Sequence, residues 1–460
     1  MESINQVLDS IDGIVWGIPL IVIILFVGLL LTIRLGGLQV VNLKNALRYA
    51  IRNENDGKGD VSSFEALCTA LAATIGTGGP GALFWMEVAA FLGMATKYAE
   101  GLLAVKYRTV GSDGSILGGP FYYIQLGIKE RFGWNFKWLA VLFAVFGVCA
   151  GLLGIGTITQ INGIASAANS VIPSGEFIAI GNHSVSYTTA IAGVVISICT
   201  ASVIIGGIRR IAKVASIIVP FMAIFYILAC VTVLLLNFSQ ISAAIETIVR
   251  AAFNPAAVTG GVVGSIFIAM QKGIARGIFS NEAGLGSAPI AAAAAKTKEP
   301  VRQGLVCMTG TFIDTIIICT MTGLVIVIGG TWEPSLGLEG VNITLEAFRK
   351  GLSFIPMGGA IAPYLLTISL AFFAFTTILG WAYYSEKCLQ FLIGKSHRKK
   401  LAYRWLYVAA VFIGPYLTVN AVWTIADIFN GLMAFPNLVA LILLSGCVAR
   451  ETKRFFAKFD

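Results

Sequence analysis

The chain has 460 residues, of which 57% are apolar and 12% charged, and its mean hydropathy is +0.85. It carries more apolar surface than one water-soluble core of this length could bury, which excludes an ordinary soluble protein. The net charge is +9, but lysine and arginine lie in short clusters between apolar runs, as in membrane proteins. We therefore expect membrane lipid, and not nucleic acid, as the anionic partner.

Residues 14–34 are apolar over the length of a membrane-spanning helix, and basic residues follow this segment but do not precede it. This predicts an amino terminus outside the cell and, with the basic end of the chain, a cytoplasmic carboxyl terminus. Ten further spans are predicted at 64–79, 80–105, 138–171, 188–207, 214–236, 260–283, 303–329, 356–381, 404–420 and 425–449. Only Arg250, Arg349 and Lys350 fall in connections that this arrangement places outside, which favours an odd number of spans.

The expected fold is an all-α integral membrane protein of about eleven transmembrane helices in a single transporter domain, residues 1–460. After the leading helix at 14–34, the spans group into two sets of five, at 64–237 and 260–449. An odd-numbered set inverts the next one relative to the membrane, as in transporters built from inverted repeats.

Two glycine-rich stretches, Ala73–Gly81 and Gly273–Gly286, lie in the first helix of each set. Such stretches interrupt transmembrane helices, and the freed amides and carbonyls can then bind a substrate carboxylate or Na⁺. A glycine-rich bend can also be only a kink or a point of close packing. Their matching positions in the two sets favour a binding site.

Polar side chains inside apolar spans are the other candidates. Thr376 and Thr377 are adjacent hydroxyls that would either ligate Na⁺ or bond back to carbonyls of their own helix. Asp314 would either pair with a buried cation or amide, such as Arg276 or backbone groups near the other broken helix, or act as a proton or ion relay. Glu65, Lys97, Glu100 and Glu386 lie near predicted cytoplasmic ends, which favours interfacial positions for them.

Several longer motifs resemble those of the alanine or glycine:cation symporter family, the sodium:alanine symporters, within the amino acid-polyamine-organocation group. The resemblance is carried by Gly273–Pro289, Gly79–Met86 and Gly93–Glu100, and it extends over nearly the whole chain through Gly118–Pro120, Leu379–Trp381 and Glu386–Cys388. It implies sodium-coupled symport of a small neutral amino acid, alanine or glycine, into the cell across the cell membrane.

The resemblance also implies a site. Substrate-binding residues would be Thr74, Gly76, Thr77, Gly78, Met270, Gln271 and Gly273, with Met270–Gly273 near the unwound part of the partner helix. The coupling ion, Na⁺, would be bound by Ala72, Ile75, Thr376 and Thr377. Asp314, Glu87 and Arg276 are further candidates.

The chain departs from the family after Gly78, where members continue with an Asn and further helical turns before the Gly-Gly-Pro-Gly motif. Only residues 64–96 are apolar enough to cross and return, fewer than the roughly 40 residues of two ordinary spans. In addition, Glu87 stands where the family usually has a Trp. These differences lead to an alternative hypothesis, that this member transports alanine poorly or not at all, and a proton-coupled variant is the other alternative.

Other classes of membrane protein lack support in the sequence. There is no GxxxxGK[ST] phosphate loop for an ATP-driven pump, and neither a Ser/His nor an HExxH constellation for an intramembrane enzyme. A channel would need polar residues repeated along several spans, whereas the polar residues within these spans occur singly. We therefore expect a secondary transporter and no enzyme; the oligomeric state is left open.

Overall fold

The computed structural model describes residues 2–52, 57, 59–70, 79–111, 115–180, 183–253, 265–338, 340–394, 396–417 and 419–458. Within them, eight helical segments are long and apolar enough to cross a membrane. They are Gln6–Arg34, Pro80–Lys106, Lys137–Val171, Tyr187–Ile204, Gly207–Leu236, Pro300–Ile328, Gly358–Ile393 and Val422–Phe456. Each coincides with a predicted span, so the all-α membrane class is confirmed.

The other three predicted spans contain shorter described helices. These are α5 (Ser63–Ala70), α15 (Ser265–Asn281) and α21 (His397–Ile413). Residues 71–78 and 254–264, which adjoin α5 and α15, lie outside the described residues. The count of eleven spans and the inverted repeat therefore stay predictions.

The remaining elements of the first half are α1 (Glu2–Val15), α2 (Ile18–Arg34), α3 (Leu38–Val41), α4 (Leu43–Ile51), α6 (Pro80–Lys106), β1 (Thr109–Val110), β2 (Ile116–Leu117), α7 (Pro120–Tyr122), η1 (Tyr123–Gly127), α8 (Ile128–Phe132), α9 (Lys137–Leu153), α10 (Ile158–Val171), β3 (Phe177–Ile180), β4 (His183–Ser186), α11 (Tyr187–Ile204), α12 (Gly207–Leu236), η2 (Phe238–Gln240) and α13 (Ile241–Phe253). The strands form two antiparallel hairpins, β1 with β2 and β3 with β4.

The second half adds α16 (Ala288–Ala292), α17 (Pro300–Thr311), η3 (Phe312–Cys319), α18 (Thr320–Ile328), η4 (Pro334–Leu336), α19 (Val341–Gly351), α20 (Gly358–Ile393), η5 (Gly414–Tyr416) and α22 (Val419–Phe456). Elements η1 and η3 are π-helical turns, and the other η elements are 3₁₀ turns. Helices α6 and α17 each begin at a proline, whose missing amide costs nothing at a helix start.

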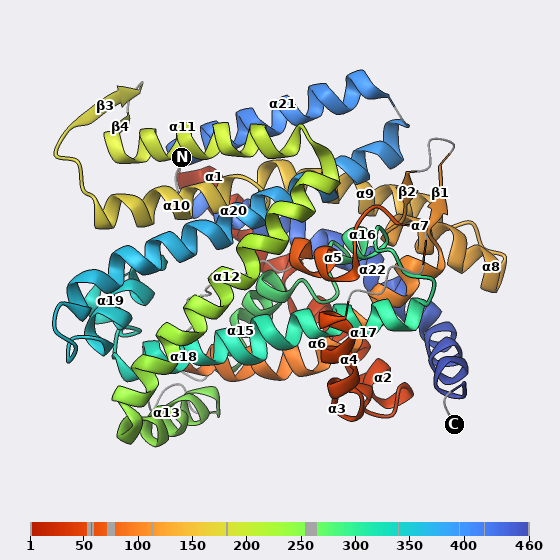
Figure 1. Cartoon of the computed structure of the whole chain (residues 1–460), viewed down its shortest axis with the longest axis horizontal. Helices are drawn as coiled ribbons and strands as arrows, with labels where there is room; N and C mark the ends of the chain where they lie inside the picture. The colour runs from red at the N-terminus through yellow and green to blue at the C-terminus, as the bar shows by residue number, and fades with distance from the viewer. Residues whose placement is uncertain are drawn as a thin grey trace.

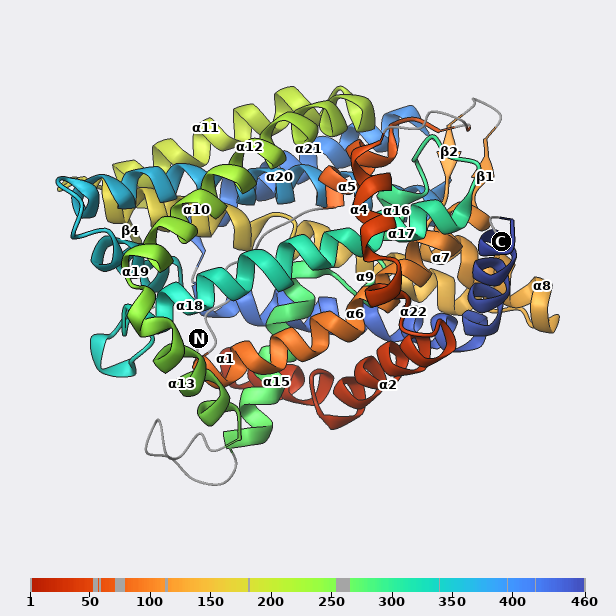
Figure 2. The ribbon, with the colours of Figure 1, turned by 60° about the horizontal axis from the view of Figure 1, so that its bottom comes forward.

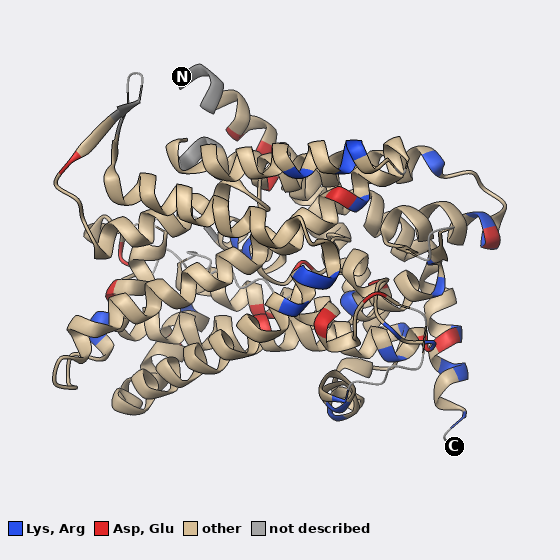
Figure 3. Ribbon diagram, turned by 45° about the horizontal axis from the view of Figure 1, so that its top comes forward, with Lys and Arg blue, Asp and Glu red and all other residues tan. Residues whose placement is uncertain are grey.

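The connections separate into two groups at opposite ends of the molecule. Figures 1 and 2 show the β3–β4 hairpin, α13 and α19 at one end, and the β1–β2 hairpin, α8 and the carboxyl terminus at the other. Lysine and arginine are more frequent toward the second end, as Figure 3 shows. The two groups are those that the charge pattern assigns to opposite sides of the membrane.

Helix α6 runs through the interior and packs closely on α15 and α17 because small residues line the contacts. A Cβ added at Gly277 of α15 would lie 3.0 Å from the Cγ of Met86, and one added at Gly304 of α17 would lie 2.7 Å from the carbonyl oxygen of Tyr98. Such contacts let helix backbones approach within a membrane domain. Any side chain at Gly304 would push α17 away from α6.

Two predicted spans differ in detail from the structure. The leading span is preceded by α1, which packs on α22, where the Trp16 indole donates to the carbonyl oxygen of Asp427 at 2.9 Å. The span at 138–171 is divided into α9 and α10, and Tyr407 donates its hydroxyl to the freed carbonyl of Gly156 at 2.7 Å. A Cβ on Gly156 would lie only 2.5 Å from that of Trp381, so the division needs glycine there.

Candidate functional site

A sharp interruption follows α15 and separates it from α16. Glu282, Gly284 and Gly286 have φ angles of 57°, 88° and 82°, in the left-handed region that a non-glycine residue rarely occupies. The interruption lies within the glycine-rich stretch 273–286 predicted to break the helix. It comes at the end of that stretch, however, and α15 is continuously helical from Ser265 to Asn281.

The Glu282 carboxylate holds this interruption against α20. Its two oxygens accept hydrogen bonds from the Trp381 indole at 2.9 Å and from the Ser287 hydroxyl at 2.7 Å, and the residue is fully buried. Satisfied buried polar groups of this kind fix one backbone geometry. They explain how Glu282 persists in an unfavourable conformation.

A second carboxylate fixes the far side of the interruption. One oxygen of Glu100, from α6, accepts hydrogen bonds from the Gly286 amide at 3.1 Å and from the Asn437 side-chain amide at 2.6 Å. The Asn437 amide also donates to the Gly284 carbonyl at 2.9 Å, and the Asn437 oxygen accepts from the Tyr123 hydroxyl. Side chains from η1, α6, α20 and α22 thus converge on one turn.

Lys97 is 3% exposed and Glu100 is fully buried, so other helices cover both residues, whose predicted positions near the cytoplasmic end of the span stay predictions. Glu386 is also mostly buried, and it forms a double hydrogen bond with Arg404. Both residues lie toward the end of α6 at Lys106, as the sequence predicts, but the sequence does not show that other helices cover them. Charged side chains in a membrane-spanning helix commonly face protein and not lipid.

Asp314 lies in the π-helical turn η3, a local geometry often found at functional sites. Its Oδ2 accepts hydrogen bonds from the Ser280 hydroxyl at 2.7 Å and the Thr315 hydroxyl at 2.9 Å. The pairing of Asp314 with Arg276 considered from the sequence is wrong. Arg276 instead donates to Asp427 Oδ2 at 2.6 Å and lies over the ring of Trp423. The sequence identifies neither Asp427 nor Trp423 as a partner of Arg276.

Three of the predicted substrate residues lie on α15, where the structure shows intact helix and not an unwound segment. Gln271 donates its side-chain amide to the Trp16 carbonyl at 2.9 Å, and Met270 packs in part against the main apolar core. Gly273 meets α6, since an added Cβ would lie 2.2 Å from the Ala82 carbonyl oxygen. Gly273 and Arg276 also border a cavity of about 40 Å³ between α6, α15 and α18.

Thr376 and Thr377 lie within α20, both 2% exposed, and both donate their hydroxyls to the Phe373 carbonyl, at 2.9 and 3.0 Å. This is the intrahelical bonding considered from the sequence, and it leaves lone pairs on each hydroxyl oxygen. Their predicted sodium-site partners Ala72 and Ile75, with Thr74, Gly76, Thr77 and Gly78, lie outside the described residues.

The described end of α5 does reach the same part of α20. The Tyr384 hydroxyl donates to the Thr69 carbonyl at 3.2 Å, and a Cβ on Gly380 would lie 2.7 Å from that oxygen. Gly380 is one helical turn from Thr376 and Thr377. The end of α5 at Thr69 therefore contacts α20 one helical turn from the two threonines.

Glu87 lies on α6 and interacts electrostatically with Asp314, and it is also close to Thr320. Its Oε1 is buried without a hydrogen-bond partner among the described residues. Residues 64–96 are too few for two spans of ordinary length. Because α6 is a full-length helix from Pro80, the missing residues belong to the first of these two spans, before Gly79.

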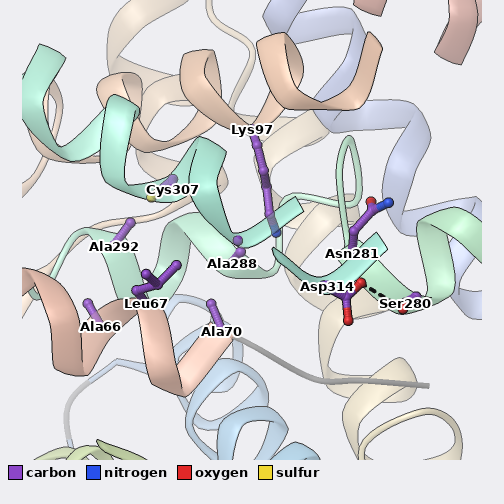
Figure 4. A pocket seen from close by; sticks show the side chains of 11 residues that line it. Ala66, Leu67, Ala70, Lys97, Ser280, Asn281, Ala288, Ala292, Cys307 and Asp314 are labelled. Carbon is purple, nitrogen blue, oxygen red and sulfur yellow. Dashed lines mark hydrogen bonds between the residues drawn. The ribbon is translucent and has the colours of Figure 1, made fainter. Parts of the chain in front are cut away.

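A small cavity lies between α5, α6, α15, α16 and α17 (Figure 4). Its volume is about 10 Å³, and Lys97, Asn281, Ser280 and Asp314 are its polar lining residues. Ala70, the last described residue of α5, also borders it.

A model of the sodium:alanine symporter family matches residues 1–460, the full length of the chain. The chain belongs to this family. It is 47% identical over 471 residues to the sodium/alanine symporter AgcS of Methanococcus maripaludis, with 99% of this chain and 98% of that protein covered. It is 48% identical over 469 residues to an uncharacterized transporter of Haemophilus influenzae, with 99% and 97% covered.

A more distant family member is named for a different amino acid. The probable sodium/glutamine symporter GlnT of Bacillus subtilis is 34% identical over 468 residues, with 98% of this chain and 91% of that protein covered. Family membership therefore establishes an amino acid transporter, and leaves the particular amino acid to experiment. The similar proteins give no support to the hypothesis that transport is impaired, whose critical residues 71–78 are not among those described.

Proposed function

We propose that the chain is a sodium-coupled symporter that brings a small neutral amino acid, alanine or glycine, into the cell by alternating access. Membership of the sodium:alanine symporter family and the extensive similarity to AgcS support this function. In this proposal the protein lies in the cell membrane with its amino terminus outside and its carboxyl terminus in the cytoplasm. The basic residues near the end that carries α8 and the carboxyl terminus support that orientation.

The observation that carries the proposal is the approach of α5 to α20 at Thr69 and Gly380. Gly380, which the Thr69 carbonyl approaches, is one helical turn from Thr376 and Thr377. Backbone carbonyls of an interrupted helix together with hydroxyl oxygens form the kind of site that binds Na⁺ in transporters. We assign Ala72, Ile75, Thr376 and Thr377 to this sodium site.

The substrate then belongs next to the sodium site, at Thr74, Gly76, Thr77 and Gly78, with Gly273 on the facing helix. Backbone amides freed in a glycine-rich segment bind a carboxylate well. The Gln271 amide is bonded to the Trp16 carbonyl, so its contribution requires that the connection between α1 and α2 move away from α15. Such a movement fits a transporter in which the two repeats, 64–237 and 260–449, rock around the site.

Replacing Thr376 and Thr377 together by valine is expected to raise the sodium concentration that half-saturates alanine binding about tenfold, because two ligand oxygens are lost. Radiolabelled alanine binding to purified protein, titrated with sodium, measures this change. Ser369→Ala is the matched control, since Ser369 is buried in α20 and its hydroxyl donates to the Leu365 carbonyl at 3.1 Å. An equal sodium dependence in the threonine variant and the control would remove the threonines from the site.

A further inference from the structure

Four aromatic side chains form a stacked ladder where α8 leads into α9. They are Phe132, Trp134, Phe136 and Trp138, at every second position of the chain. Successive ring centroids lie 4.9, 5.9 and 5.9 Å apart, and the first two pairs of rings meet at only 19° and 21°. Gly133, with a φ of 72°, ends α8 and turns the chain between the first two rings. Phe136 packs in part against the main apolar core, which fixes this aromatic ladder to the protein.

The outer side of the aromatic ladder faces lipid at the edge of the membrane. Trp138 begins a row of exposed side chains on α9 that continues with Leu142 and Val145, which are 58%, 38% and 39% exposed. These positions share one helix face, and α9 starts a membrane span, so the row lies against acyl chains. Phe132 and Trp134, 37% and 50% exposed, precede that row and therefore lie at the level of the lipid headgroups. Aromatic rings with an apolar body and a polar edge are enriched at this depth.

Basic side chains flank the aromatic ladder. Lys129, Arg131 and Lys137 are exposed, and Glu130 is the one acidic residue in the same stretch of sequence. The Arg131 guanidinium carbon lies 5.4 Å from the centroid of the Phe132 ring, so a positive charge lies beside the first ring. Helix α8 belongs to the end of the molecule that carries the carboxyl terminus, where lysine and arginine are frequent (Figures 1 and 3). The surroundings of the aromatic ladder are therefore positive, which favours an anionic partner.

We propose that the aromatic ladder and its three flanking bases form a binding site for an anionic phospholipid such as phosphatidylglycerol. The bases bind the headgroup phosphate, and the rings pack on the glycerol backbone and the upper part of the acyl chains. A soluble anion would engage the bases and leave the rings exposed, whereas a neutral phospholipid would cover the rings without balancing the positive charge. The site is separate from the transport site and depends neither on the amino acid nor on the coupling ion.

Quenching of tryptophan fluorescence by brominated phospholipids tests the site directly. Purified full-length protein is placed in phosphatidylcholine nanodiscs that contain increasing fractions of dibrominated phosphatidylglycerol or, in a parallel series, dibrominated phosphatidylcholine. The signal of the aromatic ladder is the difference from the Trp134→Phe/Trp138→Phe variant, which keeps a ring at both positions. We expect a preference for phosphatidylglycerol of about fivefold or more. Excess inorganic phosphate at constant ionic strength should leave this preference unchanged, because it has no acyl chains to cover the rings.

Replacing Lys129, Arg131 and Lys137 together by glutamine should bring the preference close to one, because the charges that attract the headgroup are lost while the rings remain. The two tryptophans should still be quenched by both lipids in this variant. Quenching should also be stronger when bromine is near the headgroup end of the acyl chain than when it is near the methyl end, because the rings lie at the interface.

The matched control is Arg250→Gln/Arg349→Gln/Lys350→Gln, which removes the same charge from α13 and α19 at the opposite end of the molecule and should keep the preference. A preference that persists without the three flanking bases, or that falls equally in the control, would overturn the proposal. Equal quenching of the wild type by both lipids would also overturn it and leave the aromatic ladder as an anchor without headgroup specificity. Absence of quenching by either lipid would do the same, since a second copy of the chain or water would then cover the rings.

Discussion

Replacing Arg276 by methionine is expected to destabilise the protein by about 3–5 kcal/mol, because it leaves the Asp427 carboxylate buried without its cation. Arg276 donates to Asp427 at 2.6 Å and lies over the rings of Phe279 and Trp423, so its loss also removes two aromatic contacts. Thermal or denaturant unfolding of purified protein in a mild detergent measures the change. The pair joins α15 to α22, and its rupture should also loosen the hydrogen bond from the Trp16 indole to the Asp427 carbonyl on α22.

The double variant Arg276→Met/Asp427→Leu is the matched control for this prediction. It removes both charges together, so most of the lost stability should return. Arg250→Met, which breaks an exposed pair with Glu246, should change stability by less than about 1 kcal/mol. A double variant as unstable as Arg276→Met alone would show that Asp427 is not the partner on which Arg276 depends.

Replacing Glu282 by alanine is expected to cost about 3 kcal/mol or more and to abolish transport, because the Trp381 indole and the Ser287 hydroxyl then lose their buried acceptor. The same change removes the side-chain bonds that hold residue 282 at a φ of 57°. Unfolding in detergent and amino acid uptake are the two measurements. Both should respond, since the interruption after α15 determines where α16 and the cavity-lining Ala288 lie.

Glu282→Gln should be milder than Glu282→Ala, since its amide keeps one acceptor oxygen for Trp381 or Ser287. Glu299→Gln makes the same chemical change at a half-exposed position paired with Lys458, and it should leave stability nearly unchanged. If Glu282→Ala unfolded like the wild type, the carboxylate could not be what fixes this turn.

The long spans could be predicted because their signal is local. The start of α6 at Pro80 and the extent of 303–329 follow from apolar length and charge, which bilayer thickness constrains directly. Apolar length and charge could not predict that the span at 138–171 is divided into two helices, α9 and α10. Its division at Gly154–Thr157 depends on Tyr407, which is distant in the sequence and reaches the carbonyl of Gly156.

The polar residues show where local reasoning fails. Distance to the predicted helix end indicates where Lys97 and Glu100 lie along the span, but it does not predict that both are buried in the protein. Arg276 and Asp427 lie 151 residues apart, and nothing near either residue indicates the other. Thr376 and Thr377 were located correctly as hydroxyls within a span, but their role depends on residues 72–75, which the structure does not describe.

Uptake of radiolabelled alanine into proteoliposomes that contain the purified chain tests the central claim most directly. With an inward sodium gradient, the account predicts accumulation above the equilibrium level, and collapse of that accumulation when the gradient is dissipated with a sodium ionophore. A proton gradient alone, with sodium absent, should drive no accumulation. Alanine that only equilibrates whatever the sodium gradient, or no uptake by well-folded protein, would contradict sodium-coupled symport.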